Sequence, residues 1–220
     1  MRALLATVVL TLGLAAPAQA AVTMDPLKLC YVSDGDLPSQ REAIHVHASG
    51  FTPTGHLTLT IDGKTVDTGR ADAFGMATAV VPAPFQGFGE RAFTLVVSEA
   101  ENPQNVASAT SRVTNLGVTL KPKRARPSRR IRFSGRGFTN LAPIYGHYLF
   151  GGKVRKTVRF VDRPVMPCGI FHARGRQIPV RKPRVGVWTL QVDQQRRYSP
   201  TPGSNAQRVV IRVTETFKQP

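Results

Sequence analysis

The chain has 220 residues, with 30 Lys and Arg against 13 Asp and Glu, which gives a formal net charge of +17. With 41% hydrophobic and 20% charged residues it can bury a core, and its composition excludes disordered polyelectrolytes, collagen-like chains, coiled coils and polytopic membrane proteins. At roughly 100 to 200 residues per domain, the length allows one large domain or two small ones.

Residues 1–20 have the pattern of a secretory signal peptide. Arg2 supplies the positive charge, residues 3–16 form a mostly apolar run, and residues 18–20 read Ala-Gln-Ala, a small-x-small cleavage site. An uncleaved membrane anchor is disfavoured because the run is shorter than the ~20 residues that a spanning helix needs. We predict cleavage before Ala21 and a secreted, extracellular mature chain without a transmembrane segment.

The remainder of the chain contains an internal repeat. Residues 44–52 align with residues 131–139 at a spacing of 87, and residues 93–97 align with residues 188–192 at a spacing of 95. Loop insertions in a duplicated domain produce such a growing offset. We predict two copies of one module, at 21–115 and 116–220, with a join near Leu116 that is too short to let them swing freely.

Each module has the period-2 pattern of half-buried strands. Residues 44–49 alternate Ile, Val and Ala with His, His and Ser, and in residues 153–160 Val154, Lys156, Val158 and Phe160 alternate with polar neighbours. The pairs at 62–63 and 151–152 suit hairpin turns, and residues 71–75 make a further turn before residues 76–81. The expected fold is all-β, with two tandem immunoglobulin-like antiparallel β-sandwich domains after a cleaved signal peptide.

The turn motifs resemble those of a known group of modules. Residues 49–53 (Ser-Gly-Phe-Thr-Pro), followed by residues 57–64 and by Ala-Asp-Ala-Phe-Gly at 71–75, are similar to the bacterial Ig-like modules of secreted proteins, such as IPT/TIG-like or neocarzinostatin-like sandwiches. The second copy keeps Gly-Phe-Thr at 137–139 but has no match to the second turn. The resemblance implies an adhesion, spacer or ligand-binding role, because such motifs mark a fold and not an activity.

Catalytic and cofactor motifs are absent from the sequence. Residues 117–220 contain only three acids, so an enzyme would need a serine, a histidine and an acid brought together by folding alone. We predict a protein that is not an enzyme and has no cofactor. His147 and His172 are expected to make only local hydrogen bonds, and Trp188 is expected to fill the core of its sandwich, with a role as an exposed sugar platform as the alternative.

Two histidines of the first module are candidate metal ligands. His45 and His47 share one face of a strand and could bind zinc or copper. No third ligand is evident, and their counterparts in the second copy are Arg132 and Ser134. We therefore expect a solvated face and no metal there.

The two cysteines, Cys30 and Cys168, lie in different modules. An oxidising compartment favours a disulfide between them, although the sequence does not give their separation. Two separate thiols, one or both of them buried, are the alternative.

Charge divides the two modules. Residues 21–116 carry 6 basic and 10 acidic side chains, whereas residues 117–220 carry 23 basic and 3 acidic ones. Because Lys and Arg are almost never buried unpaired, the second module must have a positive surface. The candidate polyanion-binding residues are Lys121, Lys123, Arg124, Arg126, Arg129, Arg130, Arg132, Arg155, Arg159, Arg174, Arg176, Arg181, Lys182 and Arg184.

The partners that suit an exported basic module are anionic surfaces and polymers outside the cell. Few aromatic residues accompany the arginines, so a groove specific for nucleic acid is not indicated. The leading hypothesis is a non-catalytic binding or adhesion protein whose second module docks on an anionic surface or polymer. The alternatives are a spacer that self-associates through acidic and basic modules, and a merely solvated face.

Overall fold

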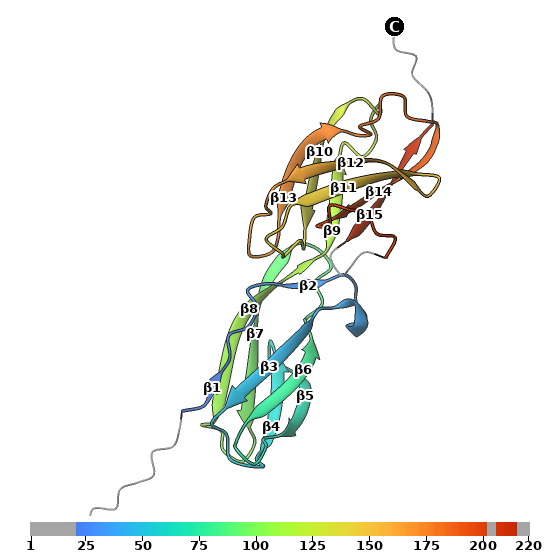
Figure 1. Ribbon diagram of the computed structural model, residues 1–220. Coiled ribbons are helices and arrows are strands. Elements are labelled where there is room, and N and C mark those ends of the chain that lie inside the picture. Colours follow the sequence, from blue (N-terminus) through green and yellow to red (C-terminus); the bar gives the residue numbers. More distant parts are fainter. Residues whose placement is uncertain (1–20, 202–205, 215–220) are drawn as a thin grey trace, which may run out of the picture.

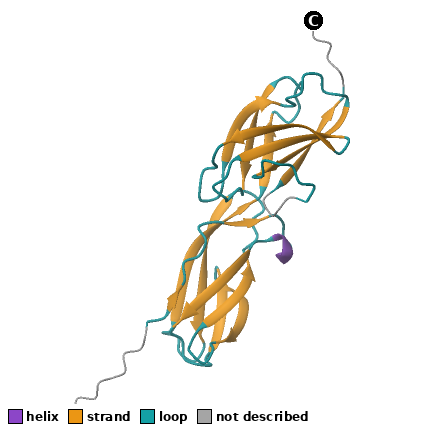
Figure 2. Ribbon diagram, viewed as in Figure 1, coloured by secondary structure: helices purple, strands orange, loops and turns teal. Residues whose placement is uncertain are grey.

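The structure is a computed structural model that describes residues 21–201 and 206–214. The predicted signal peptide, residues 1–20, lies outside the described residues. Within the described ranges no helix is both long enough and apolar enough to cross a membrane. These ranges fold into an elongated all-β molecule whose one helical element is a 3-10 turn at Pro38–Gln40 (Figures 1 and 2). The expected fold class is therefore confirmed.

The first sandwich packs a sheet of order β1-β3-β6 against one of order β2-β8-β7-β4-β5. All its strand pairs are antiparallel except β2 with β8. Its strands are β1 (Thr23–Met24), β2 (Tyr31–Ser33), β3 (Ala43–Ser49), β4 (His56–Ile61), β5 (Lys64–Arg70), β6 (Ala77–Pro82), β7 (Glu90–Glu99) and β8 (Val106–Asn115).

The second sandwich packs a sheet of order β13-β10-β9 against one of order β12-β11-β14-β15. This order repeats that of the first sandwich, with β3 matched by β10 and β7 by β14, and only β2 lacks a counterpart. Its strands are β9 (Gly117–Lys121), β10 (Arg130–Arg136), β11 (Ile144–Phe150), β12 (Lys153–Val161), β13 (Phe171–Arg176), β14 (Gly186–Asp193) and β15 (Gln207–Val213).

Each sandwich has its own apolar core. In β3 the buried residues alternate with exposed ones as expected, and Trp188 and its repeat partner Phe93 are both 2% exposed. Both ring systems therefore fill cores, as expected for Trp188. The two hairpins also form, with positive φ at Asp62, Gly63, Gly151 and Gly152.

The predicted alternation in residues 153–160 is only partly correct. The register between β11 and β12 shifts after Tyr148, so that Lys156 lies opposite Tyr148 while Val154 lies opposite Leu149. Such an irregularity places an extra residue on one strand and changes which face the following side chains take. Val154 and Lys156 are exposed, and only Val158 and Phe160 of the expected row pack against the core.

Both sandwiches share a glycine contact that links two distant turns. Phe51 donates its backbone N–H to the carbonyl of Gly75 at 3.2 Å, and Phe138 donates to Gly169 at the same distance. Gly75 and Gly169 both have positive φ. The second module thus has a counterpart of the turn glycine at 71–75, and the expected lack of a match is wrong for this residue.

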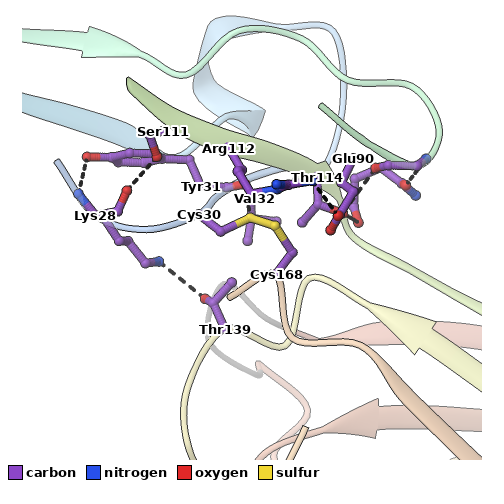
Figure 3. The surroundings of a disulfide bond; sticks show 12 residues. Lys28, Cys30, Tyr31, Val32, Glu90, Ser111, Arg112, Thr114, Thr139 and Cys168 are labelled. Atoms are coloured by element: carbon purple, nitrogen blue, oxygen red, sulfur yellow. Dashed lines mark hydrogen bonds and ion pairs between the residues drawn. A yellow bond between two sulfur atoms is a disulfide. The ribbon is translucent and has the colours of Figure 1, made fainter. Parts of the chain in front are cut away.

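The sandwiches meet end to end at a short junction (Figure 1). β8 ends at Asn115 and β9 begins at Gly117, so Leu116 is the only residue between them. Cys30 and Cys168 are joined by a disulfide whose Cα atoms are 5.3 Å apart, and both are 1% exposed (Figure 3). Beside them Lys28 donates from Nζ to Thr139 Oγ1 at 3.2 Å.

Three further contacts tie the junction. Gln207 donates from Nε2 to Asp34 Oδ1 at 2.9 Å. The Arg136 guanidinium stacks over the Phe88 ring, 4.9 Å from its centroid. Val32, from β2, packs into the core of the second sandwich. β2, the strand without a counterpart in the second sandwich, is therefore the one that packs against that sandwich at the junction.

Candidate anion-binding face

The outer face of the β13-β10-β9 sheet brings five predicted cations together. Arg132 lies directly opposite Lys121 on one side and Arg174 on the other, and Arg130 lies opposite Arg176. All five side chains are exposed. Together they form the cationic face, which consists of Lys121, Arg130, Arg132, Arg174 and Arg176.

No acid neutralises the cationic face within the described residues, where none of its five side chains forms an ion pair. The described acids of the second sandwich are Asp162, which pairs with Arg159 at 2.9 Å, and Asp193, which is buried. Like charges directly opposite each other on neighbouring strands are destabilising. The sheet therefore carries a repulsion that a bound anion would relieve.

The same positions in the first sandwich show that the fold does not require these charges. By the sequence repeat, Ala43 and His45 of β3 stand where Arg130 and Arg132 stand in β10. His45 faces Val80 of β6. The cations are thus a property of the second sandwich alone.

A hollow of about 450 Å³ opens on the cationic face. Lys121, Arg130, Arg132 and Arg174 line it together with Ile131. The cationic face therefore combines positive charge with a hollow.

Most of the other candidate residues lie at the same end of the molecule. β9 ends and β10 begins beside the cationic face, and β13 ends there, so the connections 122–129 and 177–185 project from the end opposite the first sandwich (Figure 1). The exposed candidates in these connections are Lys123, Arg124, Arg126, Arg129, Arg181, Lys182 and Arg184.

Two candidates are placed elsewhere. Arg155 and Arg159 belong to β12, an edge strand of the opposite sheet, and both are exposed. Since Arg159 is paired with Asp162, it does not add a free charge to the cationic face. The expected cationic strand face on β12 is therefore weaker than the one on β10 and β13.

Several acids of the first sandwich are paired with bases of the same sandwich. Lys28 pairs with Glu42 at 2.7 Å, and two further pairs form, Arg91 with Asp62 and Arg112 with Glu90. Glu99 is buried, and although burial raises its pKa, hydrogen bonds from Asn105 Nδ2 and Thr52 N hold the pKa below its ordinary value. Because each pair uses one acid and one base, the net charge of the sandwich is unchanged, but these four acids are not free to meet another chain.

Among the described residues, no third candidate ligand joins the two histidines of β3. His45 and His47 are both exposed on one face of the strand, as expected. The described residues contain no group of three or more His, Cys, Asp or Glu side chains that could hold a metal ion.

His147 was expected to make only a local hydrogen bond, and this expectation is wrong. It is fully buried on the outer side of its sheet, where Nε2 lies 3.2 Å from Asp193 Oδ1 and 3.0 Å from the Gln195 carbonyl. Because both neighbours are acceptors, Nε2 donates to them, and Nδ1 shares a hydrogen bond of 3.0 Å with Thr157 Oγ1. The partners come from two other strands and a loop, so only the strand register reveals them. His172 bonds to Ser134 at 3.0 Å on the neighbouring strand.

This group contains a hydroxyl, a histidine and an acid, of which the histidine and the acid are buried. His147 and Asp193 are 0% and 2% exposed, and Tyr198 from the covering loop packs its ring against His147. The two ring nitrogens are both engaged. The arrangement holds the loop 194–201 onto the sheet.

No protein-family model matches the chain. No curated protein matches it either. Similar solved structures include the N-terminal eight Ig domains of Down syndrome cell adhesion molecule (10% identity, TM-score 0.35), the human OSCAR ligand-binding domain (9%, 0.34) and the Yersinia pseudotuberculosis adhesin InvE (14%, 0.31). The matches cover 89%, 88% and 87% of this chain and 27%, 97% and 58% of those structures. The chain thus spans about a quarter of the first structure.

Proposed function

We propose that this protein is a secreted, non-catalytic binding protein whose second sandwich docks on an anionic polymer or surface through the cationic face. The observation that carries the proposal is the register of β9, β10 and β13, which sets Arg132 between Lys121 and Arg174 with no acid beside them. A fold accepts such repulsion at a cost, and an anionic partner offsets it.

The modules are further proposed to belong with the bacterial Ig-like modules of secreted proteins. The shared Gly-Phe-Thr turns at 50–52 and 137–139, each bonded to a glycine of a later turn, support this assignment. Secretion rests on the signal-peptide pattern of residues 1–20 and accords with the disulfide, since such bonds persist in oxidising compartments.

Self-association between acidic and basic modules is the weaker alternative. It needs a free acidic surface on the first sandwich, yet Glu42, Asp62 and Glu90 are already paired and Glu99 is buried. The remaining acids are too few to match the charge of the second sandwich. An external polyanion explains the uncompensated face better.

The test is retention of the full chain on phosphocellulose as salt rises. Replacing Arg132, Arg174 and Arg176 with Gln is expected to lower the eluting salt concentration and to reduce the salt slope by about one for each lost contact. The matched control replaces three exposed arginines of the same sandwich that lie near the junction, Arg163, Arg196 and Arg197.

The two triple variants remove the same charge, so a difference between them shows that the cationic face matters beyond the overall positive charge. Retention lost only in the first variant supports the proposal. Equal losses, or no retention of the native chain, would contradict it. Association that rises with concentration and vanishes in salt, without retention on the matrix, would favour the self-associating alternative.

A further inference from the structure

The hollow on the cationic face has the lining of a discrete anion site. Lys121, Arg132 and Arg174 form one row across three strands, which are ≈ 4.8 Å apart in a sheet. Arg130 stands two residues before Arg132 on the same face, about 7 Å along the strand. Four cations therefore line one open hollow of about 450 Å³.

The residue types favour a particular class of anion. Three of the four cations are arginines, whose planar guanidinium groups bond two oxygens of one oxyanion at once. A phosphate group offers three strong acceptor oxygens that point in different directions, so it can serve several of these donors together. A carboxylate offers two oxygens in one plane and satisfies fewer of them.

Arg176 provides an internal comparison. It belongs to the same face and is also exposed, but it does not line the hollow. Long-range attraction alone would make Arg132 and Arg176 equivalent. A seated anion would make Arg132 special, because only Arg132 has a cation on both neighbouring strands.

We infer that the hollow lined by Lys121, Arg130, Arg132 and Arg174 binds one phosphate-type group of the anionic partner, with the Arg132 guanidinium at its centre. This inference rests on the proposed function and adds to it a stoichiometric site with a chemical preference. The anionic polymer is then one whose repeating unit carries a terminal phosphate group, which keeps three free oxygens, and the surrounding loop cations hold its neighbouring groups by charge alone.

The experiment titrates the full chain with pyrophosphate and follows backbone amide shifts together with the heat of binding. Saturable binding of one pyrophosphate is expected, with the largest shifts in β9, β10 and β13. The charge-conserving change Arg132→Lys is expected to weaken binding about tenfold, whereas Arg176→Lys changes it less than twofold. Citrate at the same ionic strength is expected to bind at least tenfold more weakly than pyrophosphate.

The outcomes separate the site from the wider function. Equal effects of Arg132→Lys and Arg176→Lys, unsaturable shifts spread over every arginine, or citrate binding as tight as pyrophosphate would overturn the site. Phosphocellulose retention would survive each of these results, since it depends on charge. Both lysine variants keep exposed positive side chains, and unchanged amide spectra away from the hollow establish that they are folded.

Discussion

Gly75 and Gly169 show how much of the fold depends on single residues without a side chain. Each has positive φ, and a Cβ added to either would lie 2.2 Å from the backbone of the phenylalanine in the Gly-Phe-Thr turn. Backbone cannot yield as the end of a flexible side chain can. We expect Gly169→Ala to lower the free energy of unfolding by about 3 kcal/mol, measured by urea denaturation.

Gly63 is the matched control for that substitution. Its φ is 77°, close to the 65° of Gly169, but a Cβ there would meet nothing within 4 Å. Gly63→Ala is therefore expected to cost only the conformational strain, about 1 kcal/mol. Equal losses in the two variants would show that φ alone matters and that the approach to Phe138 does not.

Asp193 holds the loop 194–201 against its sheet. Its carboxylate accepts hydrogen bonds from His147 Nε2, Gln191 Nε2 and Gln195 N. Burial raises the pKa of Asp193, but these three bonds outweigh burial and hold the pKa below its ordinary value of 3.8. A carboxyl whose pKa is lowered by folding stabilises the fold above its unfolded pKa, and this stabilisation is lost as pH falls through the folded value.

Asp193→Asn is therefore expected to destabilise the protein by about 2 kcal/mol at neutral pH, because an amide meets donors where a carboxylate accepted them. The difference in unfolding free energy between native and variant chains should be constant from pH 7 to about pH 5 and should shrink below the ordinary value of 3.8. Denaturation at a series of pH values measures it. A difference that stays the same in acid would mean that the charge of Asp193 does not matter.

The alternating strands and their hairpins could be predicted from the sequence because a strand that is buried on one face alternates apolar and polar residues. The disruption in β12 could not, because a shift of register after Tyr148 leaves no mark in residues 153–160 themselves. The His147 group was missed for a related reason. Its partners Thr157 and Asp193 are 10 and 46 residues away, and only strand pairing brings them together.

The candidate site was predictable in composition but not in arrangement. Exposure of all its Lys and Arg residues follows from the cost of burying unpaired charge, and the sequence already shows the lack of acids. That Arg132 stands between Lys121 and Arg174 depends on pairing between β9, β10 and β13, and the exclusion of Arg159 depends on its bond to Asp162. The division of the chain into modules 21–115 and 116–220 stays a prediction.

At the scale of the whole molecule, the cationic face and the interdomain disulfide lie at opposite ends of the second sandwich. The cationic face lies away from the first sandwich, whereas the bond between Cys30 and Cys168 lies at the junction. The disulfide spans a sequence separation of 138. Closing so long a loop removes about 5 kcal/mol of unfolded-chain entropy in the chain-entropy model.

Replacing Cys30 and Cys168 together with Ser is therefore expected to lower the melting temperature by roughly 10 to 20 °C, since 1 kcal/mol shifts a protein of this size by about 2 to 4 °C. Calorimetry of the native chain with and without reductant serves as the comparison. Retention on phosphocellulose below the melting temperature should be unchanged, because the substitution alters no charge on the cationic face. A variant that melts like the native chain would argue against the bond, and one that stays folded but loses retention would show that the face depends on the junction.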